Sequence, residues 1–171
     1  QSVIGSVVAT SPSNAALTYS LSGSDAAALT ISTDGVLGFI AAPDFEVKSS
    51  YSVIIAVSDG TNVTTSAITV SINNVDDMAP VFTSAAAFSA AENQTSISTV
   101  TATDVDSASV TFSVDSTELA ISSGGVLSFI TAADFESKSA YSVTVTATDG
   151  INLATQDVVV TVADLNDMTP E

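Results

Sequence analysis

The chain repeats itself, and this repeat constrains its architecture more than any other feature of the sequence. Residues 35–60, GVLGFIAAPDFEVKSSYSVIIAVSDG, match residues 125–150, GVLSFITAADFESKSAYSVTVTATDG, at an offset of 90. Upstream, residues 8–21 match residues 101–114 at an offset of 93, so the first copy holds three extra residues. Self-similarity at a fixed period is typical of tandem structural units. The 171 residues are enough for two ordinary domains.

A short acidic phrase closes each copy. It is NNVDDMAP at residues 73–80 and ADLNDMTP at residues 163–170, and its proline stiffens the joint. We therefore expect one repeat at residues 1–78 and a second at residues 79–171. The chain opens directly into a strand-like pattern and stops just after the second phrase. We expect it to be a fragment of a longer protein, with the first repeat truncated at its N-terminus.

The pattern of apolar residues within each copy is that of β-strands. In YSVTVTATD, residues 141–149, every second residue is apolar, and YSVIIAVSD at residues 51–59 follows the same alternation. The pairs Asp34-Gly35 and Gly124-Gly125 are favourable for tight turns before the segments VLGFI and VLSFI. Short strands, frequent turns and the absence of a long segment with helical periodicity predict a β-sandwich in each copy.

Charge is the strongest compositional signal. Nineteen acids face two lysines, without arginine or histidine, which gives a formal net charge of −17. Such a charge disfavours nucleic acid or an anionic membrane as a partner. No run approaches 18 apolar residues, so we expect no membrane insertion. The chain has no cysteine, which excludes disulfides and thiolate metal sites and leaves the redox compartment open.

Most of the acids recur in phrases that we expect at strand ends. Residues i and i+2 of a strand point to the same side, so we expect Asp104 to converge with Asp106, and Asp44 with Glu46. Taken alone, such a motif is more often a turn than a set of ligands. Convergent carboxylates repel one another unless a cation lies among them. Calcium fits such oxygen ligands, whereas zinc, copper and iron are disfavoured without histidine or cysteine.

Four short motifs, in the expected order, resemble those of cadherin repeats. They are the acidic linker phrase ending in proline, the Asp-x-Asp at residues 104–106, the Asp-x-Glu at residues 44–46 and 134–136, and the Asp that closes the tyrosine-containing strand. The resemblance covers the whole chain and implies two tandem seven-stranded Greek-key β-sandwiches of the cadherin or immunoglobulin-like kind, joined by a calcium-binding linker. The wording TYSLSGSDAAAL at residues 18–29 is most similar to the cadherin-like repeats of large bacterial surface adhesins.

The resemblance also implies which residues bind calcium, by side chains or, at Val75 and Met78, by backbone carbonyls. The interdomain set is Asp44, Glu46, Val75, Asp76, Asp77, Met78, Asp104, Asp106 and Asp149. A second set forms half of a site for a following repeat: Glu92, Asp134, Glu136, Asp164, Asn166 and Asp167.

The sequence departs from the family pattern in several places. Asn74 replaces the first Asp of the linker, and Met78 replaces its last Asn. Ser11-Pro12-Ser13 stands where the second copy has Asp-x-Asp, so a junction upstream of the first repeat should bind calcium poorly. The glutamate that corresponds to Glu92 would lie before Gln1, so the central junction is expected to hold one fewer tightly bound ion.

These features predict a calcium-rigidified extender or adhesion segment of an extracellular cell-surface protein, which spaces a ligand-binding region from the cell. Its partners would be neighbouring repeats of the same chain, and another surface protein or glycan. An enzyme is not expected, because histidine, cysteine and arginine are absent. The alternative is a calcium-dependent recognition module for carbohydrate or for a like domain on another cell. With no tryptophan and three tyrosines, the sequence offers little surface for stacking on sugars.

Overall fold

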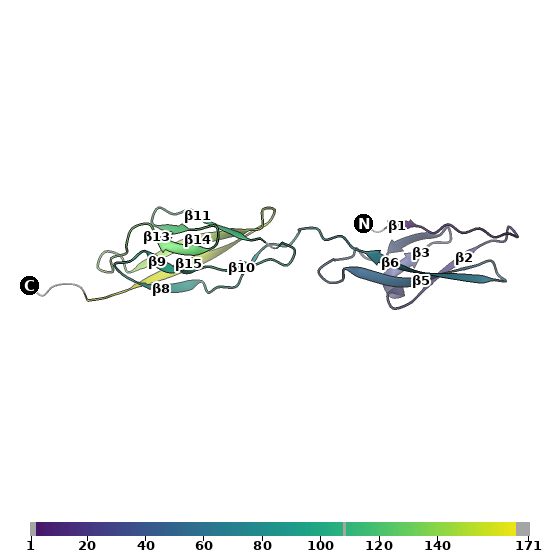
Figure 1. Ribbon diagram of the computed structural model, residues 1–171, viewed down its shortest axis with the longest axis horizontal. Coiled ribbons are helices and arrows are strands. Elements are labelled where there is room, and N and C mark those ends of the chain that lie inside the picture. The colour runs from purple at the N-terminus through teal and green to yellow at the C-terminus, as the bar shows by residue number, and fades with distance from the viewer. Residues whose placement is uncertain (1–2, 108, 167–171) are drawn as a thin grey trace, which may run out of the picture. The chain divides into compact units, whose positions relative to one another are not determined.

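A computed structural model describes residues 3–107 and 109–166, and these form an all-β protein (Figure 1). The described residues contain fifteen strands and one short 3-10 helix, η1 (Ala26–Ala28). Contacts divide the chain into two compact units, Gln1–Val75 and Asp76–Glu171, here called unit 1 and unit 2. No helix among the described residues is long and apolar enough to cross a membrane.

Unit 1 consists of two three-stranded antiparallel sheets. Its strands are β1 (Val3–Ser6), β2 (Thr18–Ser22), β3 (Leu29–Ile31), β4 (Val36–Phe39), β5 (Ser50–Ser58) and β6 (Val63–Ser71). One sheet has the order β1-β4-β3 and the other β2-β5-β6. The alternation expected for residues 51–57 is confirmed, because Val53 and Ile55 of β5 are buried and the intervening Ile54 is exposed. Buried side chains of both sheets, Leu29, Leu37, Phe39 and Val53, form one core.

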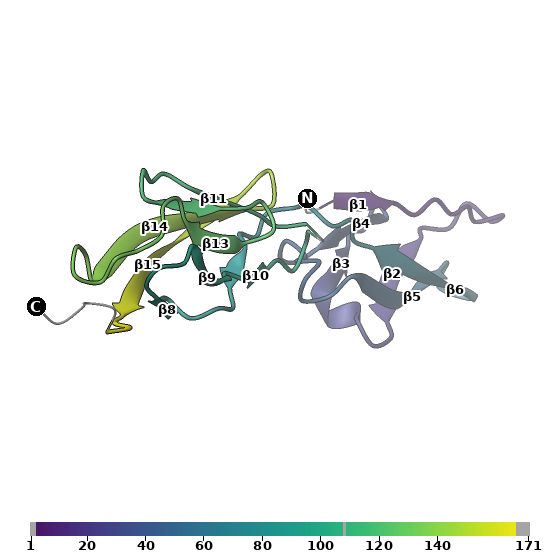
Figure 2. The same cartoon turned by 60° about the vertical axis from the view of Figure 1, so that its left-hand side comes forward.

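Unit 2 has the same plan with additional strands (Figure 2). Its strands are β7 (Val81–Phe82), β8 (Ala87–Ala91), β9 (Ser96–Thr99), β10 (Ala102–Thr103), β11 (Thr111–Val114), β12 (Leu119–Ile121), β13 (Val126–Phe129), β14 (Ala140–Thr148) and β15 (Leu153–Ala163). They form a four-stranded sheet β11-β14-β15-β8, a three-stranded sheet β12-β13-β9 and a small pair β10-β7. All pairings are antiparallel except that of β15 with β8, the last strand with one of the first, which is parallel.

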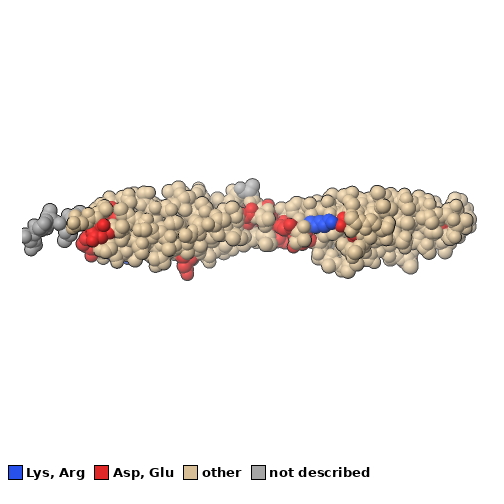
Figure 3. All heavy atoms as spheres, turned by 90° about the horizontal axis from the view of Figure 1, so that it is seen from below, with Lys and Arg blue, Asp and Glu red and all other residues tan. Residues whose placement is uncertain are grey.

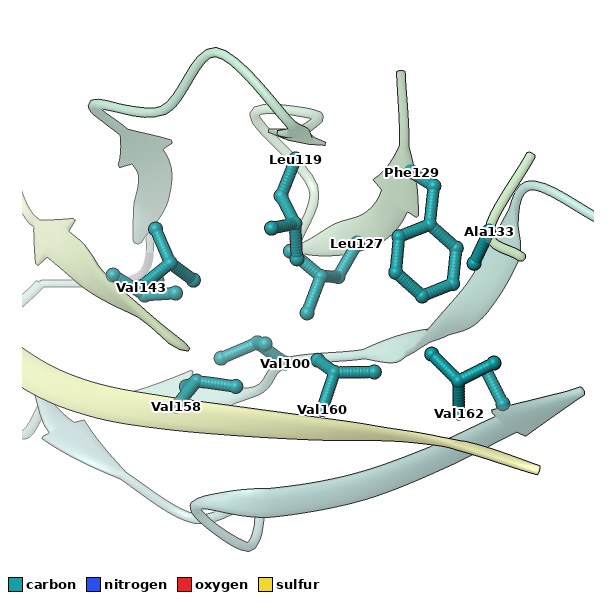
Figure 4. Packing of buried hydrophobic residues seen from close by; sticks show 11 residues of the cluster. Val100, Leu119, Leu127, Phe129, Ala133, Val143, Val158, Val160 and Val162 are labelled. Atoms are coloured by element: carbon teal, nitrogen blue, oxygen red, sulfur yellow. The ribbon is translucent and has the colours of Figure 1, made fainter. Parts of the chain in front are cut away.

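The core of unit 2 lies between its two larger sheets (Figure 4). Val158, Val160 and Val162 alternate along β15 and point toward Leu127 and Phe129 of β13 on the opposite side. Because alternate residues of a strand point to one face, this spacing buries every second side chain of β15 and leaves those between exposed. The β-sandwich predicted from the sequence is confirmed, whereas the predicted count of seven strands in each sandwich is not confirmed.

The two predicted glycine turns are present. Gly35 and Gly125 have φ angles of 79° and 88°, a region that residues with a Cβ atom rarely adopt. The N–H of each donates to the carbonyl three residues earlier, Gly35 to Ser32 over 3.0 Å and Gly125 to Ser122 over 2.9 Å. Each turn starts a core strand, β4 or β13, and so sets which side chains of that strand face inward.

Candidate metal centre in unit 2

Three carboxylates from distant parts of the sequence meet in unit 2. Asp76 lies in the linker phrase before β7, Asp104 directly follows β10, and Asp149 directly follows β14. One carboxylate oxygen of each lies within 4.8 Å of the corresponding oxygens of the other two. All three side chains are half-buried. The sandwich therefore brings three acids together at one end of unit 2, where the strands that precede Asp104 and Asp149 terminate.

The side chain of Asp104 is held in place by the turn that follows β10. The sequence had suggested that strand alternation would orient it. The N–H groups of Asp106 and Ser107 donate to Oδ1 of Asp104 over 2.9 and 2.8 Å. The Asp104 side chain thus organises the bend that follows β10, in the manner of an Asx turn. The prediction that Asp104 and Asp106 converge because they lie in a strand is wrong, since β10 ends at Thr103.

Asp149 is held in the same manner after β14. The N–H groups of Ile151 and Asn152 both donate to its Oδ1 over 2.7 Å. Burial opposes ionisation of this carboxyl, but these hydrogen bonds outweigh it and hold the pKa of Asp149 below its usual value of 3.8. In unit 1, Asp59 follows β5 in the same way, with hydrogen bonds from Asn62 and Thr61 lowering its pKa.

The remaining oxygens of two of these carboxylates have no hydrogen-bond donor. Oδ2 of Asp104 and Oδ2 of Asp149 are buried and without a partner among the described residues. A buried carboxylate oxygen without a donor is costly, and buried polar atoms are nearly always satisfied. Because the opposite oxygen of each residue is occupied by backbone N–H groups, the unpartnered oxygens are available to a further ligand.

The three carboxylates repel one another, and this repulsion contributes to a raised pKa of Asp76. Burial raises the pKa of Asp76 above its usual 3.8, and the charges of Asp149, Asp106 and Asp104 raise it further. The side-chain amide of Asn152 opposes this by donating to Oδ1 of Asp76 over 3.1 Å. The cluster thus lacks positive charge: Asp76 gains a neutral amide, and neither lysine bonds to it.

Other residues of the linker phrase are fixed through Asp106. Its Oδ2 accepts hydrogen bonds from the N–H groups of Asp77 and Met78, over 2.9 and 2.8 Å. In these contacts Asp106 shapes the backbone beside the cluster. Asn152, which sequence reasoning missed, also contacts this phrase. The sequence does contain a pattern that points to Asn152, because Asp-Gly-x-Asn occurs at residues 59–62 and again at residues 149–152.

A second acidic cluster lies elsewhere in unit 2, where Glu92, Glu136 and Asp164 bring carboxylate oxygens within 4.8 Å of one another. Glu92 is only 2% exposed and accepts hydrogen bonds from the N–H groups of Phe135 (3.0 Å) and Leu165 (2.7 Å). Glu136 and Asp164 are exposed. These three belong to the half-site expected for a following repeat.

Two further members of the expected half-site, Asp134 and Asn166, take part in local hydrogen bonds. The Oδ1 of Asp134 accepts from the N–H of Ser137 over 3.1 Å, so this side chain shapes the turn before β14. The N–H of Asn166 donates to Oδ1 of Asp164 over 2.7 Å. Asp167 lies outside the described residues.

Three of the predicted ligands, Asp44, Glu46 and Val75, belong to unit 1. Oδ1 of Asp44 accepts from the N–H of Val47 over 3.1 Å, and the backbone carbonyl of Asp44 accepts from the backbone N–H of Lys48 over 2.9 Å. Asp44 and Glu46 therefore lie in a turn, and the prediction that they converge through strand alternation is wrong. Val75 is 66% exposed.

Both lysines form ion pairs with nearby acids. Lys48 forms an ion pair with Asp25, and Lys138 pairs with Glu118 over 2.7 Å. Each ammonium also lies near a tyrosine ring, 5.1 Å from the centroid of Tyr51 for Lys48. The acids visible on one face gather in separate patches between wide uncharged areas (Figure 3). The acids that pair with the two lysines are therefore not members of the triad of Asp76, Asp104 and Asp149.

Comparisons with sequences found no match: neither a protein-family profile nor a curated protein matches the chain. Comparison with solved structures found many. Extracellular cadherin domains 3–6 of protocadherin gamma B2 match at a TM-score of 0.76 and 26% identity, over 92% of this chain and 44% of that one. Drosophila N-cadherin EC1-4 matches at 0.79 and 25% identity, over 95% and 45%.

Mouse cadherin-23 EC22-24 has a TM-score of 0.79 at 24% identity, over 97% of this chain and 61% of that one. At this identity the likeness concerns the fold. The chain thus spans about half the length of the solved cadherin chains described here. The repeat in the sequence, the two sandwiches and these structural matches agree, and the chain is built of tandem cadherin-like repeats.

Proposed function

We propose that the chain is an extracellular adhesion or recognition module, without enzymatic activity, that binds calcium through the triad of Asp76, Asp104 and Asp149. One observation carries the calcium proposal: three carboxylates lie together, and two of their buried oxygens have no donor among the described residues. Structural cores avoid such an arrangement, because it combines unsatisfied polar atoms with like-charge repulsion.

The donor set favours calcium over other ions. It consists of oxygen atoms, and calcium accepts many carboxylate ligands in flexible geometry. Zinc, copper and iron favour the imidazole and thiolate ligands that this chain does not contain. When bound, the ion neutralises the carboxylates. Affinities on the order of 10⁻⁴–10⁻³ M would suffice outside cells, where calcium is abundant.

The wider ligand set is also part of the proposal and rests on the linker motif. It assigns Asp44 and Glu46 of the first repeat, the carbonyls of Val75 and Met78, and Asp77 and Asp106 to calcium bound between repeats. Repeats divided at residues 78 and 79 would then be held at a fixed angle by the ion. A chain of this kind acts as an extender on a cell surface. The assignment to a bacterial adhesin rests on the sequence wording alone and stays a prediction.

Carbohydrate recognition is the weaker candidate. Sugar binding of this kind needs aromatic rings on the surface, and Tyr51 and Tyr141 instead pack against the two cores. Their ring centroids lie 5.0 Å from that of Phe39 and 4.9 Å from that of Phe129, respectively. A protein partner fits the proposal better than a carbohydrate. A neighbouring repeat of the same polypeptide is the first such partner.

The proposal is tested by titrating the metal-free chain with calcium in a calorimeter, beside thermal melts in calcium, magnesium or chelator. We expect calcium to bind and to raise the melting temperature, because a ligand that binds the folded state stabilises it. Asp104→Ala removes one ligand and should abolish binding at the triad. Asp115→Ala is the matched control, because Asp115 is an exposed acid of the same unit outside both clusters.

Small-angle scattering tests the extender part separately. Calcium should lengthen and narrow the particle relative to chelator, and magnesium should not. If calcium binds without changing the scattering, the triad is a metal site and the extender mechanism is wrong. If neither binding nor melting responds to calcium, the acids serve only as turn residues and surface charge.

A further inference from the structure

Hydrogen bonds between protein groups attach the linker phrase to unit 2. Oδ2 of Asp106 accepts from the N–H groups of Asp77 and Met78, over 2.9 and 2.8 Å. The side-chain amide of Asn152 donates to the backbone carbonyl of Asp76 over 3.3 Å and to its Oδ1 over 3.1 Å. Three consecutive linker residues are thus held by two loops of unit 2, one after β10 and the other after β14.

Both loops hold the linker through the same arrangement, in which an acid fixes the loop and a second residue contacts the linker. Oδ1 of Asp104 accepts from the N–H of Asp106 over 2.9 Å, and Asp106 binds the linker. Oδ1 of Asp149 accepts from the N–H of Asn152 over 2.7 Å, and Asn152 binds the linker. The two residues that contact the linker are therefore positioned in advance, which lowers the entropy cost of holding it.

The chain that follows the linker phrase is anchored as well. Pro80 is buried. Val81 and Phe82 of β7 pair with Thr103 and Ala102 of β10, and Phe82 packs against the core of unit 2. The anchored stretch therefore runs from the linker phrase into β7.

The chain is exposed just before this anchored stretch. The N–H of Ile72 donates to the carbonyl of Ser49 over 2.9 Å, which attaches the end of unit 1 to its own sandwich. Asn73, Asn74 and Val75 follow, and all three are exposed. Hinges are typically a few loop residues that lie between anchored elements and absorb the change in backbone angles. These three residues occupy such a place in the sequence.

We propose that the linker phrase stays attached to unit 2 when no calcium is bound, and that the hinge of the chain is confined to residues 73–75. Each hydrogen bond described above joins two protein groups and requires no ion. Asp106 and Asn152 are the positioning residues. Three residues span at most about 10 Å, so this hinge permits rotation but little separation. The effect of calcium on the hinge rests on the proposed function, and the attachment of the linker does not.

Two opposing effects act on the linker without calcium. Repulsion among the carboxylates of Asp76, Asp104 and Asp149 favours its release. Against this, two hydrogen bonds have the Asp106 carboxylate as acceptor, and bonds to a charged group are about twice as strong as those between neutral groups. Among residues 76–78 only the first belongs to the triad, so Asp106 holds the two that do not. We therefore expect attachment to prevail.

The test measures backbone motion of the full 171-residue chain in chelator by NMR. Relaxation of the amide nitrogens should give order parameters of about 0.85 for Asp77 and Met78, as in rigid backbone. Residues 73–75 should fall below about 0.6. The amides of Asp77 and Met78 should also be protected from hydrogen exchange, because both donate hydrogen bonds to Asp106.

Substitutions at Asp106 test its positioning role in the same buffer. Asp106→Ala removes the acceptor and should speed exchange of the Asp77 and Met78 amides at least about tenfold. Asp106→Asn keeps a side-chain oxygen and should restore part of the protection. Val105→Ala is the matched control, because the neighbouring Val105 side chain is 68% exposed, and it should leave exchange unchanged. Protection of the amides of β15 shows that each variant is folded.

Addition of calcium separates this inference from the calcium proposal. Calcium should raise the order parameters of residues 73–75 and leave those of Asp77 and Met78 nearly unchanged. If Asp77 and Met78 become ordered only in calcium, the ion folds the linker and the inference is wrong. Equal exchange in Asp106→Ala and Val105→Ala would also overturn it. If calorimetry detects no calcium binding, the calcium proposal fails, while the measurements in chelator still decide where the hinge lies.

Discussion

The side-chain amide of Asn152 donates a hydrogen bond to Oδ1 of Asp76 over 3.1 Å. This bond joins the loop after β14 to a phrase 76 residues earlier in the sequence. In unit 1, the side-chain amide of the matching Asn62 donates to Oδ2 of Asp59 in its own loop over 3.5 Å. The Asp-Gly-x-Asn sequence thus makes a contact within its own loop in both units, and in unit 2 its Asn also makes a long-range contact.

Asn152→Ala should weaken the triad without unfolding unit 2. Loss of one hydrogen bond costs about 1 kcal/mol, and the pKa of Asp76 should rise further, since the amide lowers it. NMR titration of the Asp76 carboxyl carbon measures that pKa, and calorimetry measures calcium affinity, which should fall. Asn62→Ala is the control and should change neither value. Equal effects of both substitutions would contradict a specific role for Asn152.

Asp76→Asn should stabilise the calcium-free protein. The folded state raises the pKa of Asp76, so it binds this proton more tightly than the unfolded chain does. The contribution of Asp76 to stability is therefore present at low pH and is lost as the pH rises from the usual value of 3.8 through the raised one. Thermal melts from pH 3 to pH 8 in chelator should show a higher melting temperature for Asp76→Asn above that range. In calcium the order should reverse, because the variant lacks a charged ligand.

Leu127→Ala tests the core of unit 2. Leu127 is fully buried in β13, and truncation of such a side chain leaves a cavity that costs about 2–5 kcal/mol. The neighbouring Val126 is 56% exposed, and Val126→Ala should cost about 0.5 kcal/mol or less. Urea unfolding followed by hydrogen exchange separates the two units. A similar loss for both substitutions would mean that β13 does not alternate between core and solvent.

Gly125→Ala and Gly124→Ala form a matched pair on one turn. A Cβ atom at Gly125 would lie 2.1 Å from the carbonyl oxygen of Val100, at a φ angle of 88°. At Gly124 the nearest atom within 4 Å is the Ser122 hydroxyl oxygen at 3.9 Å. We expect Gly125→Ala to cost at least about 2 kcal/mol and Gly124→Ala less than about 1 kcal/mol. Thermal melts distinguish them, and equal values would contradict the turn geometry.

The sequence predicts the fold well because its signals are local and occur twice. Alternation at residues 141–147 requires only that one face of a strand be buried, and β14 has that pattern. The glycine before each core strand is equally local, because a positive φ angle is a property of one residue. Repetition strengthens these signals, because the same pattern occurs twice at a fixed offset of 90 residues and a chance pattern would not recur in this way.

The candidate site is predicted less completely, because side-chain convergence depends on turns. Asp104 and Asp149 were identified, but each is held by backbone N–H groups of the turn that follows it, and strand periodicity does not describe this. Asn152 was missed because its partner, Asp76, is distant in sequence.

The parallel pairing of β8 with β15 has a mechanical consequence. Tension that enters at the start of β8 and leaves at the end of β15 acts at opposite ends of one ladder, which spans five residue pairs. The strands are then loaded in shear, so their hydrogen bonds share the force and must break together. An antiparallel pair pulled from one end would instead unzip bond by bond. We therefore expect unit 2 to resist force applied along these strands, and Phe88→Pro, which interrupts that ladder, should lower the rupture force measured by single-molecule pulling.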